Sequence, residues 1–143
     1  MGTILDTGHS WLLERLTYRD GLQIYVVEGI RSAEPQKLQI ASVDLGEGYS
    51  TDVNEESRHF LVVFEHVLAY QVLNESYTTR DEYEIRTNGV LSRYERSHYL
   101  DFIRSATLID SLRANAYTHF ALTLQDDIID VIAESEPKIN NAG

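Results

Sequence analysis

The chain has 143 residues, a net charge of −11 and no cysteine. This length fits one domain, the negative charge disfavours nucleic acid and anionic membranes as partners, and the lack of cysteine excludes disulfides, thiolate metal sites and a cysteine nucleophile. No apolar run approaches the length of about 18 residues that crosses a membrane, and the first residues lack the basic and apolar pattern of a secretory signal. We therefore expect a cytoplasmic protein, whose charge either serves solubility alone or favours a basic partner.

The first part of the chain carries short alternating patterns that are typical of strands. Residues 10–15 fit either a short capped helix or an edge strand. We expect the single tryptophan, Trp11, in the core because it buries a large area wherever it packs. Asp20 and Gly21 indicate a turn. Strands are predicted at 22–28 and 37–43, and the longest loop, with two glycines and five carboxylates, at 44–57.

Residues 59–75 form the longest apolar run of the chain. Apolar residues fall on both faces of a strand at 60–64, which is typical of a strand at the centre of a protein. Glu65 and His66 interrupt the run without a glycine or proline. Either two strands meet there in a tight turn, or one long strand bends and passes from one sheet to the other. We favour the bent strand.

The second half of the chain changes its period. Asn88 and Gly89 predict a hairpin turn between strands at 82–87 and 90–96. Apolar spacings of three and four then predict a helix near 97–113, with Ser97 as its cap and a break near 105–107. The remaining elements are predicted strands at 116–124 and 128–133 and a flexible tail at 134–143.

These elements predict a single domain over residues 1–143, mainly β with one helix. No helix separates the early strands, so we expect them to be antiparallel. The predicted architecture is an antiparallel β-sandwich or half-open barrel of seven to eight strands, with the helix covering one edge or end.

No spacing in the sequence predicts a catalytic residue, a metal site or a cofactor. The five histidines form no close pair, although His59, His66 and His119 with a carboxylate leave open a metal-dependent hydrolase. The acidic stretch 44–57 lacks the ordered pattern of a calcium loop. Glu82 and Glu84 share a face if they lie in a strand, but Arg80 and Arg86 beside them indicate ordinary ion pairs.

The nine tyrosines are the most unusual feature of the composition. A ring with a hydroxyl suits binding surfaces, because each part finds its own partner. Tyrosine also has a high strand propensity and often lies half-buried on sheets. If the tyrosines line a binding groove, the candidates are Tyr25, Tyr70, Tyr94 and Tyr117.

Two segments carry a resemblance to known proteins. Residues 64–75 and 118–132, with the helix start Ser97-x-Tyr-Leu between them, resemble a group of small uncharacterised bacterial β-rich proteins. The resemblance covers the C-terminal half, lies in hydrophobic patterns and implies no activity. Small acidic bacterial proteins of this size also resemble the immunity proteins of toxin systems, which implies a basic toxin as one kind of partner.

The sequence therefore predicts a non-enzymatic protein-interaction domain that binds a basic protein through an acidic, tyrosine-rich face. The alternative is a ligand- or carbohydrate-binding β-domain, followed by the histidine- and carboxylate-dependent hydrolase. Neither nucleic acid nor a membrane is an expected partner.

Overall fold

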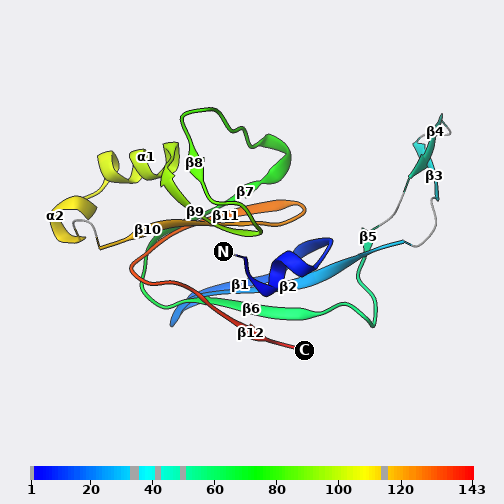
Figure 1. Cartoon of the computed structure of the whole chain (residues 1–143), viewed down its shortest axis with the longest axis horizontal. Coiled ribbons are helices and arrows are strands. Elements are labelled where there is room, and N and C mark those ends of the chain that lie inside the picture. Colours follow the sequence, from blue (N-terminus) through cyan, green and yellow to red (C-terminus); the bar gives the residue numbers. More distant parts are fainter. Residues whose placement is uncertain (1, 33–35, 41–42, 49–50, 114–115) are drawn as a thin grey trace.

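The computed structural model of this chain describes residues 2–32, 36–40, 43–48, 51–113 and 116–143. Two antiparallel sheets lie face to face, and two helices cover part of the outer face of one of them (Figure 1). This arrangement confirms the prediction of a mainly β fold with an antiparallel sandwich. The sheets do not close into a barrel.

The first sheet holds the N-terminal hairpin at its edge. Gly21 makes the hairpin turn with a φ of 87°, a value that favours glycine. Residues 10–19 are a strand, so the helix alternative for 10–15 is wrong. The members of this sheet are β1 (Ser10–Arg19), β2 (Gly21–Arg31), β6 (His59–Phe64) and β12 (Lys138–Asn141) in that order, with β5 (Thr51–Asp52) paired to β2 and the 3₁₀ turn η1 (Ile4–Thr7) preceding β1.

The second sheet carries the helices. Ser97 caps the first helix, as predicted, because its side chain accepts a hydrogen bond from the backbone N–H of Leu100. The members of this sheet, in spatial order, are β7 (Val67–Asn74), β11 (Asp127–Ala133), β10 (Thr118–Thr123), β9 (Leu91–Arg96) and β8 (Ile85–Arg86); the helices are α1 (His98–Ala106), α2 (Ile109–Arg113) and the 3₁₀ turn η2 (Glu75–Tyr77).

Some predicted segments differ from the structure. Of the strand predicted at 82–87, only Ile85–Arg86 is a strand, β8. The segment 44–57, expected as a loop, contains β5 and most of β4 (Val43–Gly48), which pairs with β3 (Gln36–Ile40) in a hairpin that lies apart from the two sheets (Figure 1). The tail expected at 134–143 contains β12, which pairs with β6. A strand of four mostly polar residues gives no hydrophobic period by which to recognise it.

A bent two-stranded ribbon joins the two sheets. Strand β6 belongs to the first sheet and β7 to the second, and the chain crosses between them at Glu65 and His66. Their partners do the same, because β11 pairs with β7 and β12 pairs with β6. At the corner, the backbone N–H of Glu134 donates to the carbonyl of His66 over 2.9 Å. The favoured prediction, that the run 59–75 bends and passes from one sheet to the other, is confirmed, and the bend at Glu65 and His66 divides the run into two strands, β6 and β7.

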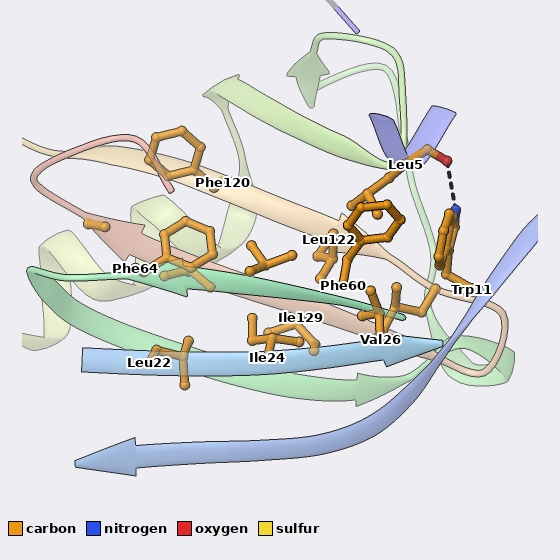
Figure 2. Packing of buried hydrophobic residues seen from close by; sticks show 14 residues of the cluster. Leu5, Trp11, Leu22, Ile24, Val26, Phe60, Phe64, Phe120, Leu122 and Ile129 are labelled. Carbon is orange, nitrogen blue, oxygen red and sulfur yellow. Dashed lines mark hydrogen bonds between the residues drawn. The ribbon is translucent and has the colours of Figure 1, made fainter. Parts of the chain in front are cut away.

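The core fills the space between the sheets (Figure 2). Alternate residues of the central strands point into it, and Trp11 closes one end by donating its Nε1 proton to the carbonyl of Leu5 over 2.6 Å. The core position expected for Trp11 is confirmed, since its side chain is buried. The central strands supply Leu22, Ile24 and Val26 from β2, Phe60, Val62 and Phe64 from β6, Phe120 and Leu122 from β10, and Ile129 and Val131 from β11.

Candidate functional site

A pocket of about 650 Å³ lies on the outer face of the second sheet, on the side away from the core. The sheet forms its floor, while helix α1 and the segment 75–84 form its walls. Polar and aromatic side chains predominate in it. The floor residues are Gln71 and Leu73 of β7, Ile128 and Asp130 of β11, His119 and Thr123 of β10, Tyr94 of β9 and Arg86 of β8; the walls add Glu75, Tyr77, Thr78, Thr79, Arg80, Glu84, His98, Tyr99 and Phe102.

The alternation of strands β10 and β11 explains why polar side chains gather here. Successive side chains of a strand point to opposite faces, so Phe120 and Val131 point into the core while His119 and Asp130 point outward. The same outer face is apolar further along, where Ile132 packs against Leu100, Ile103 and Ile109 of the helices. One half of this face is thus covered by helices and the other half is left polar.

A largely buried, hydrogen-bonded cluster forms part of the floor. His119 Nε2 lies 2.8 Å from Asp130 Oδ1, and the side-chain amide of Gln71 donates to Asp130 Oδ2 over 2.9 Å. On its other side, His119 Nδ1 lies 2.7 Å from the hydroxyl of Ser97, whose oxygen accepts from the backbone N–H of Leu100. Both ring nitrogens of His119 and the hydroxyl of Ser97 have a partner when the His119 proton sits on Nε2 and Ser97 donates to Nδ1.

This cluster contains serine, histidine and aspartate, but its geometry is that of an internal scaffold. Ser97 is fully buried, is absent from the pocket lining and caps α1 with the oxygen that would have to attack a substrate. A serine nucleophile needs a free, exposed oxygen next to its base. The chain of bonds instead fixes the start of α1 to the floor and holds the Asp130 carboxylate in place.

Two tyrosines line the floor cluster with aromatic surface. The Tyr94 ring stacks on His119 at 4.3 Å between centroids, and the Tyr99 ring meets His119 edge-on at 5.3 Å. Burial raises the pKa of Tyr94, and it raises the pKa of Tyr99 to about 12. Both hydroxyls therefore keep their protons at neutral pH and are available as hydrogen-bond donors.

Side-chain contacts tie the segment 75–84 to the first turn of α1. His98 Nε2 lies 2.9 Å from Asp81 Oδ2, and the Tyr83 ring stacks on His98 at 4.8 Å. The Tyr83 hydroxyl donates to Asp101, and Arg96 Nε donates to the Tyr83 carbonyl over 2.5 Å. The wall of the pocket is thus held by a cluster that also fixes the helix.

The four candidate tyrosines lie at different places in the fold. Tyr94 lines the pocket. Tyr25 lies on β2 under the Arg15 guanidinium at 4.1 Å, Tyr70 packs against Tyr18 at 5.2 Å, and Tyr117 hydrogen-bonds to Arg104 and Asp110. The structure therefore does not bring the four into one groove. Binding through the other three tyrosines stays a prediction that this geometry leaves untested.

The candidate histidines are also dispersed. His59 faces Glu14 on the first sheet at 3.2 Å, His66 lies at the corner of the ribbon, and His119 lies in the pocket floor. Within the described ranges, no three histidine or carboxylate side chains are grouped so as to hold a metal ion. Residues 44–50 of the acidic stretch lie outside the described side chains. None of the helices among the described residues is long and apolar enough to cross a membrane.

The sequence reasoning missed Gln71, Asp130 and Ser97 as parts of one site. The available signal was a single charged residue, Asp130, inside the apolar run 128–133, and a single amide, Gln71, inside the apolar run 67–73. A polar side chain is expensive to bury without a partner, so two such interruptions on predicted strands indicate that the strands are neighbours. Their pairing is observed, with Asp130 directly opposite Gln71.

Comparisons with protein-family models, with curated proteins and with solved structures found no match for this chain.

Proposed function

We propose that this protein binds a small, hydroxyl-bearing ligand of the carbohydrate type in the pocket on the outer face of the second sheet. The observation that carries the proposal is the hydrogen-bonded cluster of Gln71, His119 and Asp130. These polar side chains are largely buried, and they line the floor of a pocket of about 650 Å³. A concave site with a few fixed polar groups among aromatic ones is the usual form of a small-molecule site.

The chemistry of the lining supports a hydroxylated ligand. Each Asp130 oxygen uses one lone-pair direction on Gln71 or His119 and keeps another for a donor from the ligand. The Tyr94 and Tyr99 hydroxyls supply donors, and Thr123 adds a group that both donates and accepts. The half-buried tyrosine rings offer apolar faces on which the C–H side of a sugar ring can pack.

Titration of the isotopically labelled chain with a panel of mono- and disaccharides, followed by NMR, tests this proposal. A ligand that binds in the pocket should shift the side-chain amide signals of Gln71 and the backbone signals of β10 and β11. Tyr94→Ala should weaken binding, because it removes the ring and hydroxyl beside the floor cluster. Tyr25→Ala is the matched control, since Tyr25 is a half-buried strand tyrosine on the first sheet. Binding that is lost equally in both variants would contradict a site in this pocket.

A second candidate function is the binding of a basic protein, with a cytoplasmic location. The net charge of −11 supports it, and so do the apolar side chains that α1, α2 and their connection expose: Phe102 is 60 % exposed, Leu108 70 % and Leu112 69 %. Leu108 and Leu112 border an apolar hollow of about 350 Å³ that Leu68 and Ile109 also line. Exposed apolar side chains around a hollow are typical of contact surfaces.

Pull-down experiments at low and at high salt test the second candidate. A basic partner should be retained at low salt, lost at high salt because its charges are screened, and weakened by Leu108→Ser. Val53→Ser is the control, as it removes another exposed apolar side chain outside the hollow. Failure to recover any specific basic protein at either salt concentration would count against this function.

A further inference from the structure

We propose that the ligand of the pocket carries one anionic group, a carboxylate or a phosphate, which Arg86 and Arg80 bind. This inference rests on the proposed function, because it assigns the chemical class of the ligand for the same pocket. The pocket lining contains groups of both charges. Arg80 and Arg86 supply positively charged guanidinium groups, and Asp130 supplies a negatively charged acceptor in the floor.

Arg86 is the fixed member of the pair. It lies on β8, half-buried, with its guanidinium carbon 5.9 Å from the centroid of the Tyr94 ring and its Nη1 donating to Thr123 Oγ1 over 3.4 Å. Both neighbours are neutral. No carboxylate lies within ion-pair distance of Arg86 in the part of the chain that the structure describes. A guanidinium held in place with donors to spare is suited to a planar carboxylate or a phosphate.

Arg80 is the second cation of the lining. It is exposed on the segment between η2 and β8. Among the described residues, no carboxylate lies within ion-pair distance of it. Arg80 and Arg86 both act on the Tyr94 hydroxyl, where their positive charge opposes the rise that burial causes in its pKa. Both cations line the same pocket as the stacked Tyr94 ring.

The rest of the lining limits the charge of the ligand. Glu75, Glu84 and Asp130 also line the pocket, and the whole chain carries a charge of −11. Polyanions are repelled by such a field. A ligand with a single anionic group and several hydroxyls fits both kinds of lining residue. Its anionic group binds the arginines, and its hydroxyls donate hydrogen bonds to Asp130. Sugar acids and sugar monophosphates have this chemistry.

Calorimetric titration of the full chain with glucose, glucuronate and glucose 6-phosphate tests the inference, because these probes share a ring and differ in the anionic group. At least one anionic probe should bind roughly tenfold more tightly than glucose, as expected for a charge-assisted contact. The probe that gains affinity identifies the group as carboxylate or phosphate. Equal affinity for all three would overturn the anion site but leave the proposed function standing, whereas binding of none, with saccharides also failing to bind, would overturn both.

Variants assign the gain in affinity to the arginines. Arg86→Gln should lower the affinity for the anionic probe far more than the affinity for glucose, and Arg86→Lys should restore part of the difference. Arg80→Gln changes an exposed side chain and should reduce the advantage without affecting the fold. Arg19→Gln is the control, because it removes the same charge from the end of β1 on the other sheet. If Arg19→Gln lowers the affinity for the anion as much as Arg86→Gln, the effect is one of net charge and the proposed site is wrong.

Discussion

At the scale of single residues, Ser97 joins the helix to the pocket floor. Its hydroxyl caps α1 and donates to His119, so Ser97→Ala removes a cap and also leaves a buried ring nitrogen without a partner. The two losses predict a decrease of about 2–4 kcal/mol in the free energy of unfolding, measured by urea denaturation. Ser92→Ala is the control, since Ser92 is equally buried but makes only one long hydrogen bond, of 3.5 Å, to the Ala121 carbonyl. A similar, small effect of both substitutions would contradict the role given to Ser97.

The pair of His98 and Asp81 gives the wall of the pocket a dependence on pH. The hydrogen bond between them raises the pKa of His98 and lowers the pKa of Asp81. The contribution of His98 is complete below its ordinary pKa of 6.5 and is lost as the pH rises through the raised value. That of Asp81 is complete above its ordinary pKa of 3.8 and is lost as the pH falls through the lowered value. The pair is therefore fully formed between pH 3.8 and 6.5.

NMR titration of the His98 ring measures this effect. Asp81→Asn should bring the pKa of His98 down towards its ordinary value, and the signals of the segment 75–84 should become insensitive to pH above 6. Glu82→Gln is a suitable control, since Glu82 is a neighbouring carboxylate whose side chain makes no contact with His98 in the structure. An unchanged pKa of His98 in Asp81→Asn would show that the pair does not form in solution.

Residue types could be predicted from the sequence more readily than their partners. Ser97 was recognisable as a cap because capping depends on the local sequence. The bonds of His119 to Ser97 and Asp130 join residues 22 and 11 positions apart. These bonds depend on how β9, β10 and β11 are aligned with one another in the sheet. The alternation of apolar residues in the sequence does not define this register. For the same reason, the sequence indicated Tyr94 as a candidate binding residue but could not distinguish it from Tyr25, Tyr70 and Tyr117, which lie elsewhere in the fold.

At the scale of elements, strand β12 covers the edge of β6. Removing residues 138–143 should lower the free energy of unfolding by about 1–3 kcal/mol, because Ile139 loses its packing against the core and β6 loses its neighbour. The new edge should also promote self-association. Denaturation and size-exclusion chromatography measure the two effects. Removal of Gly143 alone is the control, and equal stability of the two truncated chains would show that β12 contributes nothing.

The elements themselves show which sequence signals are sufficient. The long run 59–75 was recognisable as a bent strand because its apolar pattern continues on both sides of Glu65 and His66 without a turn residue. The helix and its break were recognisable from the change of period. Strands β12 and β5 were not, since each is short and mostly polar, and each forms only because a long neighbouring strand offers it an edge.

At the scale of the whole molecule, the net charge of −11 acts against the compact state. Like charges held on one small surface repel each other, and salt screens this repulsion. Added sodium chloride should therefore raise the melting temperature at pH 7, as followed by circular dichroism. The control is the same series near pH 4.7, the isoelectric point, where the rise should vanish. A melting temperature that falls with salt at pH 7 would mean that surface ion pairs outweigh the repulsion.

The bent ribbon has a consequence for the order in which the molecule can assemble. Residues 59–74 find their partners at 127–141, so both sheets are incomplete until the last part of the chain has arrived. The intervening residues carry η2, β8, β9, both helices and β10, which are the walls and much of the floor of the pocket. Closing so long a loop is slow. We therefore expect the hairpin of β1 and β2 to form early and the two sheets to be completed together in one late, cooperative step that also forms the pocket.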